Sequence, residues 1–196
     1  MTMEVQLMSY WEKSIQLHGH QCCVLAVGYR AGRYAKELLA QTEENQELFA
    51  IVETVDCSTD AIQVVLGCTT GSRRLLVKEQ GKHVFIISNH EKAVRIALKP
   101  NVLVSKGDVF LDLMNKVANG DATEEQRSKF YKLQDPLMEY ILKAPAEELF
   151  MIKYVPSIFR EPGYNFDIKV CEKCKEGVAS MFAQNNRGQY LCQSCI

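Results

Sequence analysis

The sequence predicts an α+β protein, with a core of packed helices and a mixed or antiparallel sheet followed by a small C-terminal module. Two observations predict this organisation. Helical and β-rich segments succeed one another over roughly the first 160 residues, and four of the eight cysteines gather in the last 26. A chain of 196 residues is long enough for one good core with an appendage, or for two small domains.

Two helices are predicted at the start of the chain. Residues 3–17 have the apolar spacing of an amphipathic helix, and Gly19 suits a break after it. A second helix is expected over about residues 20–40. Small residues form a stripe along this helix, which permits another helix to approach closely and so compensates the cost of up to ~1 kcal/mol that each helical glycine carries. The stripe consists of Gly28, Ala31, Gly32 and Ala35.

The middle of the chain predicts strands around one short helix. Four β-rich runs are expected to form strands, the second and third of them as a hairpin. These runs are residues 48–55, 75–78, 83–88 and 92–98. After the first strand, Asp60 is expected to cap a short helix over residues 61–66 that ends at Gly67.

Two longer helices are expected next, over residues 107–119 and 123–142, with Asp108 and Thr123 as their caps. Gln126 follows Thr123 by three residues, which is the spacing of a capping box. A final strand is then expected at residues 151–155.

Proline and glycine after that strand indicate a linker. The residues concerned are Pro156, Pro162 and Gly163. We therefore expect a core domain over residues 1–160 and a second domain over residues 161–196. The order of the elements gives an α+β core that precedes a separate C-terminal module.

Composition argues against several classes of protein. The 23 Lys and Arg and 24 Asp and Glu residues give a net charge of −1, so overall charge does not support binding to nucleic acid or to an anionic membrane. No apolar run approaches the ~20 residues of a membrane span. The N-terminus also lacks the basic and apolar regions of a signal peptide. A cytoplasmic protein with no membrane partner is therefore expected.

The C-terminal cysteines form two C-x-x-C pairs, Cys171 with Cys174 and Cys192 with Cys195, at a spacing typical of a four-cysteine zinc site. A hairpin is predicted between them, from residues 178–182 and 189–191. A module this small cannot bury a sufficient core, so the metal must supply its folding energy. The alternative is two redox pairs, but redox C-x-x-C motifs normally begin a helix in a thioredoxin-like setting. We therefore expect a zinc ribbon that holds one structural Zn²⁺.

Near the N-terminus, His18, His20 and Cys22 lie within five residues. If this segment is helical, His18 and Cys22 share a face at i, i+4, a workable metal-binding spacing. If a helix begins only at His20, Cys22 lies in its first turn, where the helix dipole favours the thiolate. Either geometry suits a metal ligand or a nucleophile. Hydrogen-bonded histidines beside a buried cysteine remain the alternative.

Cys57 and Cys68 bracket the predicted short helix, with Asp60 and Gln63 between them and Thr69 directly after. The residues from Gly67 onwards lack the spacing of a Walker phosphate-binding loop. An ordinary turn, with both cysteines as small packing residues, is the alternative to a functional site here.

These residues together resemble the FmdE family, which is named for one of the subunits of formylmethanofuran dehydrogenase. The family's first motif, H-G-H-x-C-P-G-x₃-G-x-R, matches residues 18–30 except that Cys23-Val24 replaces Pro-Gly. Its second motif, E-x₃-C-x-x-D-A-I-Q-x₃-G-C-T-x-G, matches residues 53–71. A downstream Gly81-Lys82 and the C-terminal cysteines also match, so the resemblance covers nearly the whole chain.

The resemblance implies an α+β core that forms a tight homodimer, with the His/Cys motif lining a cavity near the interface. The residues expected to line this cavity as a cofactor site are Cys57, Asp60, Gln63, Cys68 and Thr69. A molybdenum or tungsten dehydrogenase, or another redox enzyme, is implied as a partner. No defined catalytic activity follows from the family.

Three functions remain open. The first is an accessory metalloprotein in which His18 and Cys22 hold a transition metal, with His20, Cys57 and Cys68 as nearby candidate ligands. Thiolate and imidazole favour Zn, Fe, Ni or Cu over Mg or Ca. The second is an enzyme that uses Cys22 as a nucleophile or a metal-activated water. The third is a regulator or adaptor whose ribbon binds protein or nucleic acid, the latter with weak support because acidic residues partly balance the basic residues of the ribbon.

Overall fold

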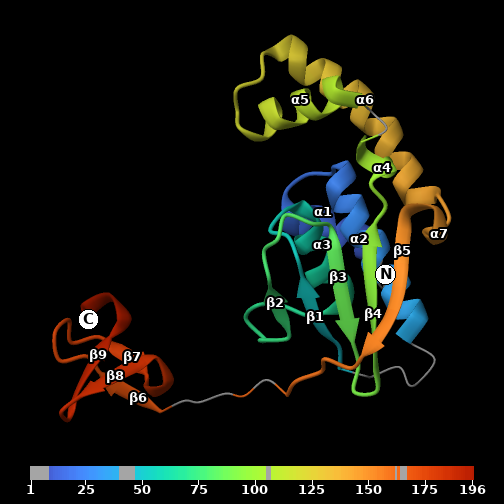
Figure 1. Cartoon of the computed structure of the whole chain (residues 1–196). Coiled ribbons are helices and arrows are strands. Elements are labelled where there is room, and N and C mark those ends of the chain that lie inside the picture. The colour runs from blue at the N-terminus through green and yellow to red at the C-terminus, as the bar shows by residue number, and fades with distance from the viewer. Residues whose placement is uncertain (1–8, 40–46, 105–106, 162, 164–166) are drawn as a thin grey trace, which may run out of the picture. The chain divides into compact units, whose positions relative to one another are not determined.

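The computed structural model describes residues 9–39, 47–104, 107–161, 163 and 167–196 (Figure 1). The chain divides into two compact units, Met1–Arg160 and Glu161–Ile196. The first unit contains a five-stranded sheet with packed helices, and the second contains two small two-stranded sheets. This confirms the predicted α+β class with an appended C-terminal module.

The sheet of the first unit is mixed and has the strand order β2-β1-β3-β4-β5. Its strands are β1 (Phe49–Val52), β2 (Leu75–Val77), β3 (Val84–Ser88), β4 (Lys92–Leu98) and β5 (Phe150–Pro156). Only β1 and β2 pair in parallel; the other pairs are antiparallel. The strands present Phe85, Ile87, Val94 and Ile96, all fully buried, to the main core.

The predicted hairpin of residues 75–78 with 83–88 is wrong. β2 and β3 do not pair with each other, because β1 lies between them and pairs with both. Residues between the two strands pass the end of β1, where the backbone N–H groups of Gln80 and Lys82 both donate to the Glu53 carbonyl (2.9 and 3.2 Å). The hairpin of this region is instead β3 with β4.

Three helices pack together on the sheet: α1 (Tyr10–His18), α2 (Cys23–Leu39) and α3 (Cys57–Leu66) (Figure 1). The break predicted at Gly19 is confirmed, since this residue ends α1 with a left-handed φ of 91°. The close helix approach predicted from the small-residue stripe is also confirmed. A Cβ atom at Gly28 would lie 2.0 Å from the Ser58 carbonyl oxygen, so α3 of the same chain covers the stripe.

Helix α3 begins four residues earlier than predicted, and Asp56, not Asp60, is its N-cap. Asp56 has extended backbone geometry and its carboxylate accepts a hydrogen bond from the Ser58 N–H (2.8 Å), as an N-cap requires. Gly67 ends the helix, as predicted. Cys57 is therefore the first residue of α3, and Asp60 lies one turn further along.

The remaining helices are α4 (Asn101–Val104), α5 (Gly107–Ala118), α6 (Glu124–Lys143) and α7 (Ala146–Leu149). The capping box of Thr123 and Gln126 is confirmed at the start of α6. Asp108, predicted as a cap, lies inside α5, whose described part begins one residue before it. Helix α5 and the first half of α6 extend beyond the end of the sheet and pack through the stacked rings of Phe110 and Phe130 (Figure 1).

The second unit consists of two hairpins. Strand β6 (Ile168–Val170) pairs with β7 (Gly177–Ala179), and β8 (Ala183–Asn186) pairs with β9 (Gln189–Cys192). The predicted hairpin of residues 178–182 with 189–191 is wrong in its first strand, whereas its second strand corresponds to β9. The β8–β9 hairpin has positive φ at Arg187 and Gly188, as in a type I′ turn. Its first strand begins at Ala183, because residues 177–179 pair with β6 instead. Among the described residues, no helix is long and apolar enough to cross a membrane.

Candidate functional site

Three ligand-type side chains meet where α1 ends and where α2 and α3 begin. One ring nitrogen of His18 and the Sγ atoms of Cys22 and Cys57 all lie within 4.8 Å of one another. His18 is the last residue of α1, Cys22 directly precedes α2, and Cys57 is the first residue of α3. The fold therefore brings the N-terminal His/Cys motif onto the first of the two cysteines that bracket α3. We call these three residues the core site.

The core site is largely shielded from water. Cys22 is 6% exposed and the His18 side chain 14% exposed, whereas Cys57 is half-buried. A small cluster of apolar side chains packs against the two cysteines of the core site. It consists of Leu25, Ala61, Trp11, Ile15, Val24 and Tyr29. Electrostatic interactions at the core site are therefore stronger than they would be in water.

The two nitrogens of the His18 ring have different surroundings. Nδ1 lies 2.8 Å from the Asp60 Oδ2 atom. Nε2 is buried and has no hydrogen-bond partner among the described residues. An unsatisfied buried polar atom costs about 1–3 kcal/mol, so such an atom in a native site needs an explanation. A metal ion bound to Nε2 would supply one, and the residues present therefore fit a metal.

The two thiols of the core site differ in acidity. A hydrogen bond from Cys57 lowers the pKa of Cys22; burial opposes this effect, and the Leu25 N–H, 3.2 Å from the Cys22 Sγ atom, adds to it. The pKa of Cys57 is raised, first by the same hydrogen bond and then by burial. Cys22 is thus the more acidic of the two thiols, and Cys57 holds its proton more tightly. This proton is the one that a metal binding both sulfurs would displace.

His20 lies beside the core site and is not one of its three ligand-type residues. Its ring is tilted against that of His18, with 4.4 Å between the ring centroids, and the residue is exposed. Burial, and then repulsion from His18, lower the pKa of His20. A neutral ring at this position does not repel a cation bound next to it.

Asp56 and His83 support the core site and were not singled out from the sequence. The Asp56 carboxylate pairs with His83 Nε2 (3.0 Å) and also accepts from the Thr54 hydroxyl (2.9 Å). Burial raises the pKa of Asp56, but hydrogen bonds from His83 and Ser58 outweigh it and the net pKa lies below the ordinary value. Asp is a usual N-cap residue, whereas nothing local to His83 in the sequence predicts its contact with Asp56.

In the second unit, four cysteines form another cluster, the ribbon site, whose sulfurs also lie within 4.8 Å of one another. Cys171 and Cys174 lie in the turn between β6 and β7, and Cys192 and Cys195 at the end of β9 and just after it. Sulfurs bound to one tetrahedral ion at ~2.3 Å are about 3.8 Å apart. The Cys174 and Cys192 Sγ atoms are 3.8 Å apart, so the ribbon site has room for a single ion.

Backbone hydrogen bonds prepare Cys171 to act as a thiolate. The N–H groups of Cys174 and Cys192 lower the pKa of Cys171 to about 6, and the Cys192 nitrogen lies 3.4 Å from the Cys171 sulfur. Metal ions bind the thiolate form of cysteine. The sulfur geometry and this acidity both fit a metal ion held by four cysteines.

A comparison with protein families gives a match over residues 17–151, to a family described as "FmdE, Molybdenum formylmethanofuran dehydrogenase operon". The match covers more than half of the chain and includes every residue of the core site. The chain belongs to the FmdE family. This confirms the resemblance inferred from the two sequence motifs.

A solved structure supports the FmdE fold. It is the crystal structure of a tungsten formylmethanofuran dehydrogenase FmdE-like protein from Syntrophus aciditrophicus, with a TM-score of 0.57 and 21% sequence identity. The similarity covers 99% of this chain and 96% of that one. At this level of identity the likeness concerns the fold alone.

A curated relative is the "Probable S-adenosyl-L-methionine-binding protein" of Archaeoglobus fulgidus, which is 32% identical over 170 residues. The aligned region covers 82% of this chain and 46% of that protein. The chain therefore spans about half the length of this relative, and the name of the relative describes that longer protein.

The cysteine that replaces proline in the first FmdE motif is not part of the core site. Cys23 is 1% exposed and packs in the main hydrophobic core. Burial raises the pKa of its thiol to about 12. It therefore behaves as a small apolar side chain and adds no further ligand to the group formed by His18, Cys22 and Cys57.

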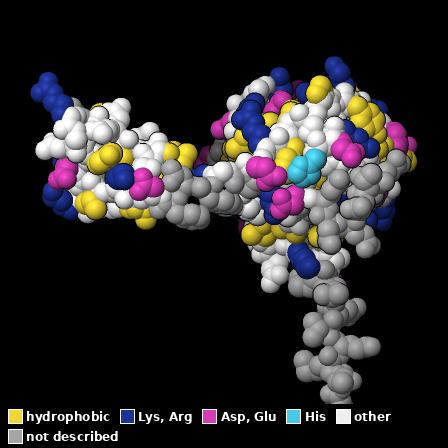
Figure 2. Space-filling model, turned by 90° about the horizontal axis from the view of Figure 1, so that it is seen from below, with side chains coloured by type: hydrophobic (Ala, Val, Ile, Leu, Met, Phe, Trp, Pro, Cys, Tyr) yellow, Lys and Arg dark blue, Asp and Glu magenta, His cyan; other side chains and the backbone are white. Residues whose placement is uncertain are grey.

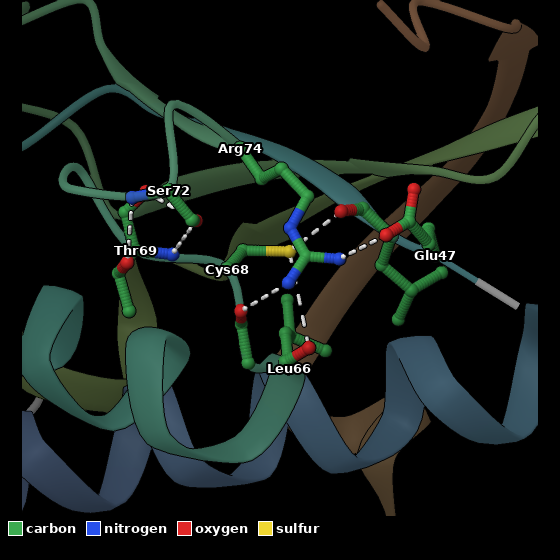
Figure 3. Close-up of polar contacts among 8 residues, drawn as sticks. Glu47, Leu66, Cys68, Thr69, Ser72 and Arg74 are labelled. Carbon is green, nitrogen blue, oxygen red and sulfur yellow. Dashed lines mark hydrogen bonds and ion pairs between the residues drawn. The ribbon is translucent and has the colours of Figure 1, made fainter. Parts of the chain in front are cut away.

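The second FmdE motif is split between the two ends of α3, so Cys68 and Thr69 do not belong to the group formed by His18, Cys22 and Cys57. Helix α3 has ten residues, which at ~1.5 Å per residue separate its ends by about 15 Å. Figure 3 shows Cys68 beside the Arg74 guanidinium, which pairs with Glu47 (3.1 Å).

Cys68 and Thr69 have structural contacts instead. The Cys68 thiol is buried and donates to the Leu48 carbonyl (2.9 Å), and burial raises its pKa to about 12. The Thr69 hydroxyl accepts from the Ser72 N–H (3.0 Å) within a turn (Figure 3). Of the expected cavity residues, Cys57 lies at the core-site end of α3, and Asp60 and Gln63 follow it by one and two helical turns.

Proposed function

We propose that this FmdE-family chain is a metal-binding accessory protein, with a transition metal at the core site and a structural Zn²⁺ at the ribbon site. The observation that carries the proposal is the convergence of one ring nitrogen of His18 with the Cys22 and Cys57 sulfurs, together with a buried His18 Nε2 atom that has no hydrogen-bond partner among the described residues. Each of the three belongs to a different helix end. Their meeting is therefore a product of tertiary folding and not of local sequence.

The donor set narrows the choice of metal. Two sulfurs and one imidazole nitrogen suit Zn, Fe, Ni or Cu, whereas Mg and Ca prefer oxygen ligands. Three protein ligands leave one position of a tetrahedral ion open to water or another small ligand. This distinguishes the core site from the ribbon site, where four cysteines would fill every position. We propose that the open position is where the accessory function takes place.

The proposed partners are a second copy of the chain and a redox enzyme. The family description, which names the formylmethanofuran dehydrogenase operon, supports the enzyme partner. The small-residue stripe gives the dimer no support, because α3 of the same chain covers it. A nucleic-acid partner is less well supported: on the face shown in Figure 2, basic side chains are interspersed with acidic and apolar ones over the described residues.

Metal analysis of the full chain tests the proposal. We expect two metal equivalents per chain in the wild type, and one in His18→Ala, Cys22→Ser and Cys57→Ser. Cys68→Ser is the matched control, because it removes a buried cysteine next to the same helix but outside the core site, and it should retain both equivalents. One equivalent in the wild type, unchanged in the core-site variants and lost in Cys171→Ser, would show that only the ribbon binds metal.

A further inference from the structure

We propose that Asp60 is a positioning residue of the core site, which holds the His18 ring in the tautomer that offers Nε2 to the metal. The inference rests on the proposed function, because it concerns the same site. Two observations carry it: the 2.8 Å contact between His18 Nδ1 and Asp60 Oδ2, and the buried Nε2 atom without a hydrogen-bond partner among the described residues.

The hydrogen bond to Asp60 determines which ring nitrogen of His18 carries the proton. A neutral imidazole has one N–H and one lone pair, and an ionised carboxylate can only accept a hydrogen bond. Nδ1 must therefore carry the proton that bonds to Asp60, which leaves the lone pair on Nε2. A buried lone pair without a donor is unfavourable on its own but is what a metal ligand requires. Metal-ligating histidines are commonly oriented by a carboxylate in this way, which also makes the ligating nitrogen more basic.

Helix α3 supplies both a ligand and this positioning carboxylate. Cys57 and Asp60 are three residues apart, so their side chains lie on the same face of the helix. Asp60 lies in the first turn, where the helix dipole stabilises a negative charge. Gln63, a further three residues along, donates to the other Asp60 oxygen (3.4 Å). The carboxylate is therefore held from its own helix while it contacts the end of α1.

The tautomer can be measured directly by long-range ¹H–¹⁵N correlation NMR of the full chain with its core metal removed. The chain has four histidines, so the His18 signals can be assigned by substituting each histidine in turn. We expect His18 in the Nδ1–H form in the wild type and a shift to the Nε2–H form in Asp60→Ala. Asp112→Ala removes an exposed carboxylate from α5 and should leave the His18 signals unchanged.

Metal affinity provides the second measurement, by Co²⁺ titration followed through the thiolate-to-cobalt absorption. Asp60→Ala should weaken Co²⁺ binding at the core site by about 10–100-fold, with all three ligands present. If Asp60→Ala does not fold, the isosteric Asp60→Asn replaces it. The amide of this variant can also donate to Nδ1, so we expect a larger Nε2–H population and weaker binding.

The outcomes separate this proposal from the proposed function. A wild-type His18 in the Nε2–H form, or an Asp60 variant with unchanged tautomer and affinity, would overturn the positioning role while the metal site stands. A wild type that binds no Co²⁺ outside the ribbon would overturn the metal site, and the NMR measurement would still decide whether Asp60 sets the tautomer. A shifted tautomer together with weakened binding supports both.

Discussion

At the scale of single residues, the core site depends on side chains that hold its ligands in place as much as on the ligands themselves. Asp56 is an example. Its carboxylate caps α3, pairs with His83, and so fixes the helical turn that begins with Cys57. Asp60, from the same turn, contacts His18. The two aspartates thus hold two of the three ligand-type residues from one short stretch of chain.

We predict that Asp56→Ala lowers the free energy of unfolding of the first unit by about 0.5–2 kcal/mol, the usual effect of losing an N-cap. Urea unfolding followed by the fluorescence of Trp11, the single tryptophan, measures it. Asp108→Ala is the matched control, because its carboxylate lies inside α5 and away from α3. Equal losses in the two variants would show that Asp56 has no special role as a cap.

The lowered pKa of Asp56 also predicts how stability depends on pH. A carboxyl group with a lower pKa in the folded state stabilises the protein above its unfolded pKa, near 3.8, and this contribution is lost as the pH falls through the folded pKa. We expect the wild type to lose more stability than Asp56→Asn on acidification below about pH 4. His83 is the titratable partner of Asp56, so His83→Gln should reduce the same difference. Parallel acid profiles in all three proteins would contradict this assignment.

At the scale of elements, helix α3 joins the parts of the core site, and its close contact with α2 sets their spacing. The contact is closest at Gly28, where any side chain would meet the backbone of Ser58. At Gly32, one turn further along α2, a Cβ atom would meet side chains and no backbone, with Val65 at 3.0 Å and Ile62 at 3.6 Å. The two glycines therefore test backbone packing and side-chain packing separately.

Gly28→Ala should destabilise the first unit by about 1–3 kcal/mol, because overpacking against backbone exceeds the ~1 kcal/mol gained in helix propensity. Gly32→Ala gains the same propensity and meets a side chain, so its loss should be smaller. The Trp11 fluorescence transition measures both variants. Gly28→Ala should also weaken metal binding at the core site, since it separates Cys22 from Cys57. A Gly28→Ala variant as stable as Gly32→Ala would contradict the close approach.

Among the elements, helix ends and helix packing could be predicted from the sequence, whereas strand pairing could not. Local signals are strong at Gly19, at the Thr123 capping box and at the small-residue stripe of α2, and these predictions are confirmed. The pairing of β2 with β1 depends on where the chain returns to the sheet after α3. The spacing of apolar residues along the sequence carries no information about that position. The sequence predicts Asp60 as the cap of α3, but the extended backbone at Asp56 makes that residue the N-cap.

The candidate sites, like the fold, could be predicted from the sequence only in part. Spacing alone predicts the four-cysteine cluster of the ribbon, because both pairs belong to one small module. In the core, Cys57 and Cys68 look equivalent in sequence since both bracket α3, and the length of that helix places only Cys57 beside His18 and Cys22. The pairing of His83 with Asp56 has no local sequence signal, because it depends on the position of β3 relative to the start of α3.

At the scale of the whole molecule, the two units differ in what stabilises them. The first has an extensive apolar core, whereas in the second Cys171 is the one fully buried apolar residue among those described. With so small a core, the second unit should depend on a metal ion at the ribbon site to fold. The same dependence does not apply to the first unit.

We therefore predict that a strong chelator unfolds the second unit and leaves the first folded. Amide NMR spectra should lose the dispersed signals of residues 167–196 and keep those of the sheet. The cooperative urea-unfolding transition followed by Trp11 fluorescence should persist at the same chelator concentration. Cys171→Ser should reproduce this result without chelator and retain the core metal. Dispersed ribbon signals that persist after complete metal removal would contradict a metal-dependent fold.

Anomalous scattering from a crystal of the full chain loaded with one transition metal tests the central claim most directly. The account predicts two peaks per chain, one among the four ribbon cysteines and one bound by His18 Nε2, Cys22 Sγ and Cys57 Sγ. A single peak at the ribbon, with the core site fully ordered and free of metal at saturating concentration, would contradict it.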